Sequence, residues 1–185
     1  DTDRSRGLGD VYKRQNLYGY EAGGNGPESG RHAIRFAPGT GELGMFQGAK
    51  SYLLENPEGQ TLDTYSISAG LDYASVGPEH AWLKDIGRVN YSWATDQEAM
   101  SAFKDLCETE GIIPAIESSH AVAGAYKAAA DLKAKGYEHP VMIINISGRG
   151  DKDMNTAGKW FGYLTDEQAK ALEANGAQGN NADGE

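Results

Sequence analysis

A hydroxyl among small residues follows the most apolar run of the chain. Residues 141–146 are almost all apolar, and Ser147-Gly-Arg-Gly150 comes directly after them. In open α/β sheets, ligands bind beyond the carboxyl ends of the strands, and small residues there let backbone N–H groups and a hydroxyl approach a ligand closely. This feature alone favours a plain tight turn, with a ligand site at Ser147 and Gly148 as the alternative interpretation.

Two other segments offer carboxylates. Glu117 stands at the start of an alanine-rich helical pattern, where it is either a first-turn acid favoured by the helix dipole or a functional carboxylate. Residues 66–78 combine hydroxyls, glycines and one acid, Asp72. Such a segment can present carbonyl groups and a carboxylate to a cation or a substrate. From the residues alone we reach a ligand-binding α/β domain and no particular reaction.

Composition excludes several other classes of site. The chain has one cysteine, Cys107, so a disulfide framework or a multi-thiolate metal site is excluded. Its four histidines lack the His-x-x-x-His spacing of a zinc site. The net charge of −10 argues against nucleic acid and anionic membranes as partners. No apolar run reaches the roughly 18–20 residues of a membrane span, and we expect a soluble, cytoplasmic protein.

Periodicity predicts the elements that position these residues. Residues 16–20 and 88–94 resemble strands. Thr95 and Glu98 form a capping box that opens a helix ending at Gly111. Spacing of i, i+3, i+4, i+7 and i+8 places five residues on one face of this helix, namely Ala99, Ala102, Phe103, Leu106 and Cys107.

The second half of the chain continues the alternation. A second helix is predicted over about residues 118–135 and stops at Gly136. Residues 141–146 read as a strand buried on both faces. A last short helix begins at Thr165, with Gln168 completing another capping box. Helices that alternate with apolar runs indicate an α/β fold with a mostly parallel sheet flanked by helices.

The two ends differ from the middle in composition. Residues 1–15 carry four basic and three acidic side chains with little apolar periodicity, and we interpret them as an appendage outside the fold. Residues 16–164 form the domain. Residues 165–185 are expected to be a short helix and a flexible tail, which begins at about residue 175.

Three of these segments resemble the β subunit of tryptophan synthase. They are residues 65–80, 110–121 and 145–153, and the similarity extends over about residues 16–154 with the same order and spacing. The resemblance implies an incomplete domain of the pyridoxal-phosphate (PLP) fold-type II class. It also implies condensation of indole with L-serine to L-tryptophan by a parent enzyme that pairs with an α subunit and a second β subunit.

The resemblance assigns roles to single residues. Ser147 matches the hydroxyl that faces the PLP pyridine nitrogen, with Gly148 beside it. A neutral serine, unlike an acid, does not hold the ring nitrogen protonated, which moderates the electron sink. Glu117 matches the acid near the cofactor ring and its 3-oxygen. Asp72 matches the acid that engages the serine hydroxyl and helps to close the site.

Three further positions carry over from the resemblance. Tyr73 and Ser75 match residues whose backbone carbonyls bind an activating monovalent cation, Na⁺ or K⁺. Phe46 matches a position that lines the indole tunnel near the α subunit. Gln47 stands where the family often has an aromatic residue.

Other parts of the family's active site have no counterpart here. The lysine that binds PLP and the Gly-Gly-Gly-Ser-Asn phosphate loop are both missing from the sequence. We therefore expect a C-terminal portion of the enzyme that does not catalyse by itself. The alternatives are another fold-type II PLP enzyme such as a serine or threonine dehydratase, a non-catalytic module that binds an amino acid or a partner, and an incomplete gene product with no function of its own.

Overall fold

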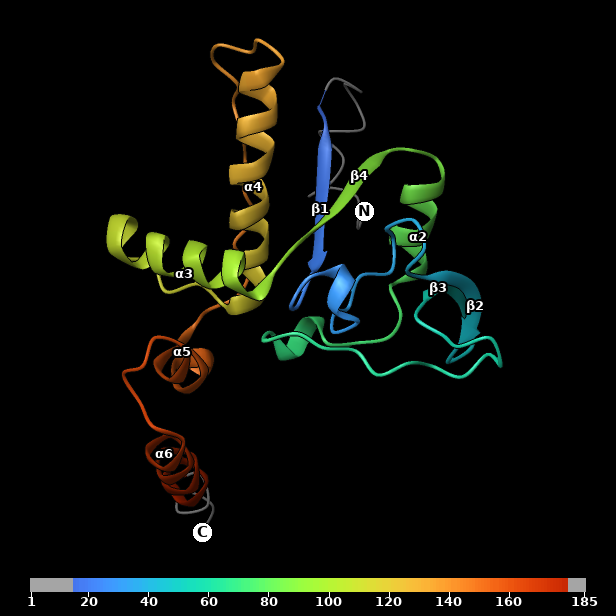
Figure 1. Ribbon diagram of the computed structural model, residues 1–185. Coiled ribbons are helices and arrows are strands. Elements are labelled where there is room, and N and C mark those ends of the chain that lie inside the picture. Colours follow the sequence, from blue (N-terminus) through green and yellow to red (C-terminus); the bar gives the residue numbers. More distant parts are fainter. Residues whose placement is uncertain (1–14, 180–185) are drawn as a thin grey trace.

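The chain was studied as a computed structural model, which describes residues 15–179 (Figure 1). Four strands and five α-helices lie in this part of the chain, with three short 3₁₀ turns at Pro27–Ser29, Ala69–Leu71 and Asp151–Asp153. The strands are β1 (Leu17–Ala22), β2 (Glu42–Phe46), β3 (Ala49–Leu53) and β4 (Val89–Ala94). The helices are α2 (Pro78–Asp85), α3 (Asp96–Glu110), α4 (Ile116–Ala134), α5 (Met154–Trp160) and α6 (Asp166–Gly179).

The strands expected at 16–20 and 88–94 form the centre of the fold. β1 and β4 pair in parallel, from Leu17 opposite Val89 to Ala22 opposite Ala94. Helix α4 packs against both strands, and α2 packs against β4 (Figure 1). This arrangement confirms the α/β class with a parallel sheet flanked by helices.

Small residues allow α4 to approach the sheet closely. A Cβ atom at Gly124 would overlap the ring of Tyr20 on β1, so only glycine fits at this crossing. Ala123 and Val122 are buried on the same helix, in a cluster with Ala94 of β4 and Ala102 of α3. The alanine-rich sequence of α4 therefore brings its backbone against the sheet, which fixes the position of its first turn.

The predicted helix ends are confirmed. The Thr95 Oγ1 accepts the Glu98 amide at 3.3 Å, while Glu98 Oε2 accepts the Thr95 amide at 2.8 Å, so the capping box at the start of α3 is complete. Gly111 ends α3 in a left-handed conformation with φ 65°. The box of Thr165 and Gln168 forms at the start of α6.

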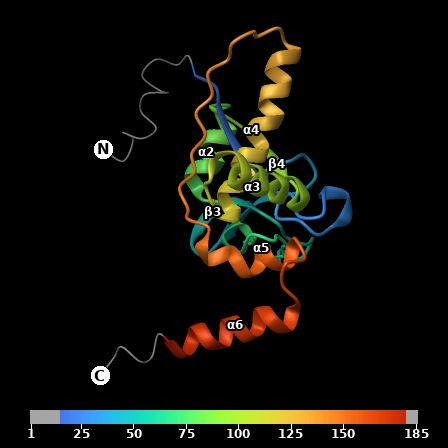
Figure 2. The same cartoon turned by 90° about the vertical axis from the view of Figure 1, so that its left-hand side faces the viewer.

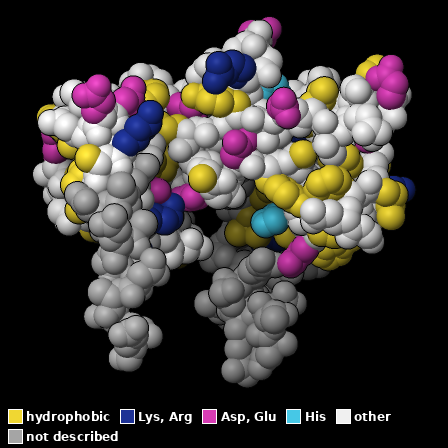
Figure 3. Space-filling model, turned by 90° about the horizontal axis from the view of Figure 1, so that it is seen from below, with side chains coloured by type: hydrophobic (Ala, Val, Ile, Leu, Met, Phe, Trp, Pro, Cys, Tyr) yellow, Lys and Arg dark blue, Asp and Glu magenta, His cyan; other side chains and the backbone are white. Residues whose placement is uncertain are grey.

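The sequence analysis missed an antiparallel hairpin. β2 and β3 pair from Glu42 opposite Leu53 to Phe46 opposite Ala49. The two residues of the turn, Gln47 and Gly48, both have positive φ, at 49° and 80°, as in the primed turns that match the twist of a hairpin. Hydrophobic side chains gather on the half of the molecule that carries α2 and this hairpin (Figure 3).

The buried strand predicted at 141–146 is wrong. The segment is extended but lies in no sheet, and Val141 and Ile143 are 94% and 91% exposed. An apolar run favours a buried strand only where neighbouring strands and covering helices exist. The described residues supply packing on one side alone, through Ile146 against the cluster of Ala94 and Val122.

The C-terminal prediction is also corrected in part. Helix α6 continues to Gly179, so residues 175–179 are helical and do not belong to a tail. Residues 180–185, and residues 1–14 of the proposed appendage, lie outside the described residues. Within the described part, no helix combines the length and the apolar character that crossing a membrane requires.

Candidate functional site

Five separate segments meet beyond the carboxyl ends of β1 and β4. The loop after β1 is joined to the start of α3 by the Asp96 amide, which donates to the Gly24 carbonyl at 2.9 Å. The Asp96 carboxylate then accepts the Ile67 amide at 3.2 Å, which fixes the segment that leads to Asp72. The first turn of α4 and residues 147–153 complete the group.

Glu117 lies at the centre of this junction. Its Oε1 accepts the Gly70 amide at 3.0 Å, and its Oε2 lies 2.9 Å from the Lys152 Nζ. Partial burial raises the pKa of Glu117, but the hydrogen bonds from Lys152 and from backbone amides outweigh it, so the pKa lies below its ordinary value. Glu117 is therefore an ionised carboxylate at neutral pH.

Lys152 links two carboxylates. Its Nζ also donates to both Asp153 oxygens at 2.8 Å. Burial lowers the pKa of Lys152, yet the hydrogen bonds to Asp153 and Glu117 dominate and raise it above the ordinary value. The Asp153 Oδ2 in turn accepts the Ile116 amide at 2.9 Å, which satisfies an unpaired N–H in the first turn of α4.

Backbone contacts hold Ser147 and Gly148 against the same helix. The Gly148 carbonyl accepts the Ala115 amide at 3.0 Å, and its own amide donates to the Ser118 Oγ at 3.3 Å. A Cβ atom at Gly148 would lie 2.7 Å from the Ala115 Cβ, so a larger residue would push this loop away. Ser147 is exposed, and its hydroxyl has no hydrogen-bond partner among residues 15–179.

Asp72 lies on the loop that touches Glu117. It follows the 3₁₀ turn Ala69–Leu71, and its side chain is exposed. A Cβ atom at Gly70 would lie 2.5 Å from the Glu117 Oε1, so a glycine at this position permits the loop to approach α4. The structure therefore brings together the loop of Asp72, Glu117 and the Ser147–Gly148 turn.

His120 is a buried polar residue in the first turns of α4, close to this junction. His120 is 1% exposed; its Nδ1 lies 2.9 Å from the Ile116 carbonyl, and its Nε2 has no partner among the described residues. Burial lowers the pKa of His120, although the Ile116 carbonyl and the Asp96 carboxylate oppose this shift. His120 is therefore neutral and has a structural role. The spacing of the chain's four histidines also gave no reason to expect a metal site at His120.

The two residues expected to bind a cation lie on one segment beside β3, with a bend at Ala74 between them. The Ala74 carbonyl accepts the Leu54 amide at 2.9 Å, and the Val76 amide donates to the Tyr52 carbonyl at 3.2 Å, which holds this segment beside β3. The Tyr73 carbonyl accepts a hydrogen bond from the Arg35 guanidinium. One positive charge is thus already in place at this carbonyl.

Arg35 and Glu21 form an ion pair that the sequence analysis missed. Glu21 Oε1 accepts both the Arg35 Nε at 2.9 Å and the Arg35 amide at 3.0 Å, and both residues are 6% exposed. Burial raises the pKa of Glu21, with Arg35 acting in the opposite direction. A single acid within the apolar pattern of β1 is the only sequence signal for this pair.

Phe46 belongs to a small aromatic group at the hairpin turn. Its ring meets the Tyr73 ring edge to face, with centroids 5.7 Å apart. The Tyr73 hydroxyl donates to the Gln47 Oε1 at 2.8 Å. Phe46, Gln47 and the proposed cation segment are therefore adjacent, although they are separated by 26 residues or more in sequence.

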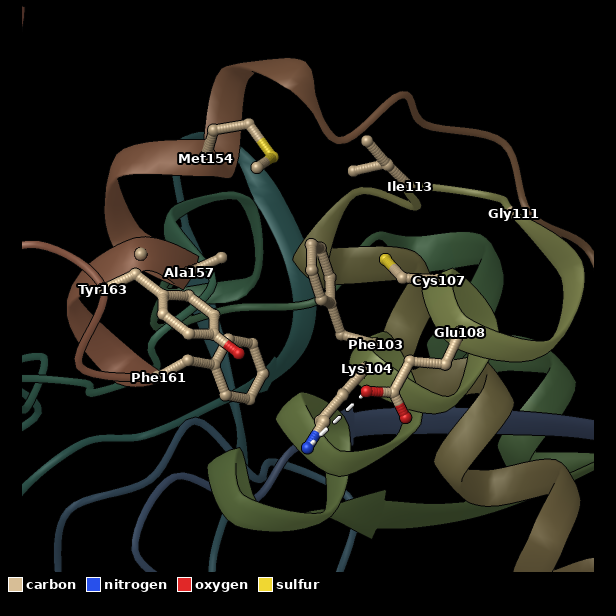
Figure 4. A pocket seen from close by; sticks show the side chains of 11 residues that line it. Phe103, Lys104, Cys107, Glu108, Gly111, Ile113, Met154, Ala157, Phe161 and Tyr163 are labelled. Atoms are coloured by element: carbon tan, nitrogen blue, oxygen red, sulfur yellow. Dashed lines mark ion pairs between the residues drawn. The ribbon is translucent and has the colours of Figure 1, made fainter.

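A separate apolar pocket lies between α3 and α5. Its volume is about 420 Å³, and Figure 4 shows Phe103, Cys107 and Met154 pointing toward it. The pair of Lys104 and Glu108, 3.7 Å apart, stands beside it. None of the seven predicted site residues lines this pocket, so it is distinct from the junction at Glu117.

Comparison with known proteins identifies relatives of the chain. No protein-family model matches it. The tryptophan synthase beta chain of Mycobacterium tuberculosis strain H37Rv is 59% identical over 148 residues, which cover 80% of this chain and 34% of the relative. This chain is a homologue of the tryptophan synthase beta chain. The Mycobacterium leprae and Bordetella pertussis tryptophan synthase beta chains are 56% and 49% identical, and they are covered over 34% and 36% of their lengths.

The similarity covers only part of each relative. The chain spans about a third of the length of the tryptophan synthase beta chains that it matches. The identity of these relatives confirms the resemblance drawn from segments 65–80, 110–121 and 145–153. The share of their length that is covered agrees with the expectation that this chain corresponds to only a portion of the enzyme.

Proposed function

We propose that this chain is the C-terminal part of a tryptophan synthase beta chain and forms one side of its PLP site. The complete enzyme condenses indole with L-serine to L-tryptophan and water. The observation that carries the proposal is that Glu117 accepts the Gly70 amide while the neighbouring Ser118 accepts the Gly148 amide, because all three resembling segments contribute to this junction.

Ser147 and Gly148 suit the ring of the cofactor. The Ser147 hydroxyl is exposed and unpartnered within the described residues, so it is free to hydrogen-bond a pyridine nitrogen. Gly148 keeps the turn thin and close to Ala115. When bound, PLP supplies an electron sink for bonds at the substrate α-carbon. A serine at the nitrogen leaves that nitrogen unprotonated, whereas an acid would hold its proton.

The two carboxylates have different tasks in this proposal. Glu117 is held ionised by Lys152 and by the Gly70 amide, so it can accept a hydrogen bond or a proton near the cofactor's 3-oxygen. Asp72 is exposed on a loop beside it and can accept a hydrogen bond from the hydroxyl of the substrate L-serine. In this assignment Glu117 is held in place by hydrogen bonds, whereas Asp72 is an exposed acid on a loop.

The isolated chain is proposed to be inactive. Covalent binding of PLP needs an unprotonated lysine amine. Lys152, the lysine at the junction, is bound to Glu117 and Asp153, and its raised pKa keeps it an ammonium. The chain also lacks the family's glycine-rich phosphate loop. Both groups must therefore come from the part of the enzyme that this chain does not match.

The proposal also includes a monovalent cation and two protein partners. We propose the carbonyls of Tyr73 and Ser75 as ligands of a shared Na⁺ or K⁺ site on the resemblance alone. The Arg35 guanidinium donates to the Tyr73 carbonyl, and its positive charge opposes a cation there. Leu43 and Met45 are 50% and 69% exposed next to Phe46. Exposed apolar side chains of this kind support a protein partner at the hairpin, and we propose the α subunit there and a second β subunit in the complete enzyme.

A covalent chimera tests the proposed function. Residues 16–154 replace the matching segment of the Mycobacterium tuberculosis tryptophan synthase beta chain, and tryptophan formation from indole and L-serine is measured. We expect an active chimera, while the isolated chain forms no tryptophan. In the chimera, Glu117→Gln should lower kcat by at least about 100-fold, the usual scale of a positioned acid or base.

Ser101→Ala is the matched control, because Ser101 is exposed on α3 and lies outside the junction. It should leave kcat unchanged. Pyruvate release from L-serine in place of tryptophan would support the dehydratase alternative. An inactive chimera that folds and binds PLP, or tryptophan formation by the isolated chain, would contradict the proposal.

A further inference from the structure

The pocket between α3 and α5 has the size of a site for a small molecule. In both views α5 lies between α3 and α6 (Figures 1 and 2). The volume of the pocket is about 420 Å³, and pockets for small organic ligands span roughly 300–1,000 Å³. No residue of the junction at Glu117 lines this pocket, so its chemistry has to be derived from its own walls.

Three aromatic rings form much of the pocket wall. The Phe103 and Phe161 ring centroids are 6.3 Å apart, and so are those of Phe161 and Tyr163. The sulfur atoms of Cys107 and Met154 lie on the same wall (Figure 4). Aromatic rings and polarizable sulfur atoms both make favourable contacts with a further aromatic ring. The apolar part of a fitting ligand is therefore aromatic.

Charge at the pocket is confined to one pair of side chains. Among the lining residues, only Lys104 and Glu108 are ionised at neutral pH, because burial and the neighbouring Glu108 both raise the pKa of the Cys107 thiol. The Lys104 Nζ and the Glu108 Oε1 are 3.7 Å apart, which is longer than a hydrogen bond, and both side chains are at least half exposed. Both groups can therefore still bond to a ligand.

This pair of opposite charges discriminates between ligands by their charge. A ligand with only a carboxylate would be attracted by Lys104 and repelled by Glu108, which lies one helical turn away, and a ligand with only an ammonium would meet the reverse. A free amino acid carries both groups on one carbon atom and can satisfy both side chains. Within a peptide the same residue has amide bonds in place of both charges and loses this advantage.

We propose that the pocket between α3 and α5 binds a free aromatic amino acid. The ring of the ligand lies against Phe103, Phe161 and Tyr163, its carboxylate bonds to Lys104, and its ammonium bonds to Glu108. The proposal does not rest on the proposed function, because the pocket and the junction share no residue.

A set of four ligands tests the site on the full 185-residue chain. L-Phenylalanine is compared with phenethylamine, which lacks the carboxylate, with 3-phenylpropionate, which lacks the ammonium, and with N-acetyl-L-phenylalaninamide, which has neither charge. NMR titration of the backbone amides gives both Kd and the place of binding. We expect L-phenylalanine to bind at least about threefold more tightly than each of the others, the scale of ion pairs open to solvent. The shifts should fall on residues 103–113 and 154–163.

Two substitutions assign each charge of the ligand to its partner. Lys104→Gln should abolish the preference for L-phenylalanine over phenethylamine, and Glu108→Gln should abolish the preference over 3-phenylpropionate. Lys133→Gln and Glu138→Gln are the matched controls, because both side chains are exposed, lie outside the pocket and change charge in the same way. Both controls should keep both preferences.

A third substitution fills the pocket. Met154→Trp places a large ring in the space of the ligand and should raise the Kd of L-phenylalanine at least about tenfold. Leu172→Trp is its control, because Leu172 on α6 is exposed to a similar extent, 50% against 45% for Met154. Thermal unfolding shows whether each variant retains the wild-type fold, and the four ligands decide the question on the wild-type chain alone if one does not.

The outcomes separate this site from the proposed function. Shifts at residues 103–113 and 154–163, together with tighter binding of the amino acid than of its three analogues, support the site. Absence of binding, equal Kd values for L-phenylalanine and N-acetyl-L-phenylalaninamide, or shifts confined to the junction at Glu117 overturn it. Tryptophan formation by the chimera does not bear on these results, so either proposal can fail while the other stands.

Discussion

At the scale of single residues, Lys152 keeps the carboxylate of Glu117 ionised. Its ammonium lies against Glu117 and Asp153, and it is the main group that offsets the partial burial of Glu117. The stabilisation from ionised Glu117 is present above its ordinary pKa of 4.5 and is lost as the pH falls through the lower pKa of the folded state. The pair therefore couples the charge of the site to its stability.

Lys152→Met should raise the pKa of Glu117, because burial then acts without the opposing ammonium. A ¹³C NMR titration of the Glu117 side-chain carboxyl carbon measures the shift. Lys159→Met is the control, since the ion pair of Lys159 is with Asp166 and not with Glu117. An unchanged titration of Glu117 in Lys152→Met would show that the ion pair does not set its charge.

His120 makes the fold sensitive to mild acid. Its pKa is lowered from 6.5 by burial, with Asp96, Glu117 and Glu98 as the neighbouring negative charges. Below pH 6.5 the unfolded chain takes up the proton first, so the free energy of unfolding falls by at most about 1.4 kcal/mol per pH unit until the folded pKa is reached.

His120→Asn should flatten this dependence, because asparagine can keep the bond to the Ile116 carbonyl without titrating. Urea unfolding between pH 7.5 and 5 measures the effect. His139→Asn is the control, as His139 is exposed. Equal acid sensitivity of the wild type and His120→Asn would contradict the assignment.

At the scale of elements, two capping boxes of the same kind differ in what they stabilise. Thr95 with Glu98 and Thr165 with Gln168 are both complete capping boxes. Helix α3 packs against α4, and Glu98 also binds Lys127 of α4 at 2.7 Å. Helix α6 packs only against α5 among the closely packed element pairs. The same motif therefore stabilises the core in one case and a peripheral helix in the other.

Thr95→Ala should lower the global free energy of unfolding by about 1 kcal/mol, the usual cost of a lost cap. Thr165→Ala should leave global unfolding almost unchanged and increase exchange only within α6. Chemical denaturation followed by circular dichroism gives the first value, and hydrogen exchange gives the second. Equal losses in global stability would show that α6 unfolds together with the core.

At the level of the whole molecule, apolar side chains face solvent over separate regions. Val141 and Ile143 lie on the unpaired segment, and Leu43 and Met45 lie on the hairpin. Groups of exposed apolar side chains are typical of sites of protein association. We therefore expect the isolated chain to bind a hydrophobic dye while it retains its secondary structure.

Replacement of Val141 and Ile143 by lysine should reduce dye fluorescence without a loss of helical circular dichroism. Leu172→Lys combined with Tyr163→Lys is the matched control, because both side chains are exposed and the change in charge is the same. If the control reduces fluorescence as much as the lysine pair at 141 and 143, residues 141–146 are not the main exposed apolar site.

The sequence by itself determined the local features of this protein. The capping boxes at Thr95 and Thr165 and the helix end at Gly111 depend on neighbouring residues and intrinsic backbone preferences, and all three were predicted correctly. The strand β4 followed from its β-branched and aromatic residues, and β1 from the short strand-like pattern at residues 16–20. The similarity of long segments also pointed to the tryptophan synthase beta chains, which the comparisons found as relatives.

Only the tertiary structure decided the non-local features. The contact of Lys152 with Glu117, the buried pair of Glu21 and Arg35, and the meeting of Gly70 with α4 join residues that are 14 to 47 positions apart. The same is true of residues 141–146, whose apolar run predicted a buried strand. Whether an apolar strand is buried depends on the neighbours that the rest of the chain supplies, and no local pattern contains that information.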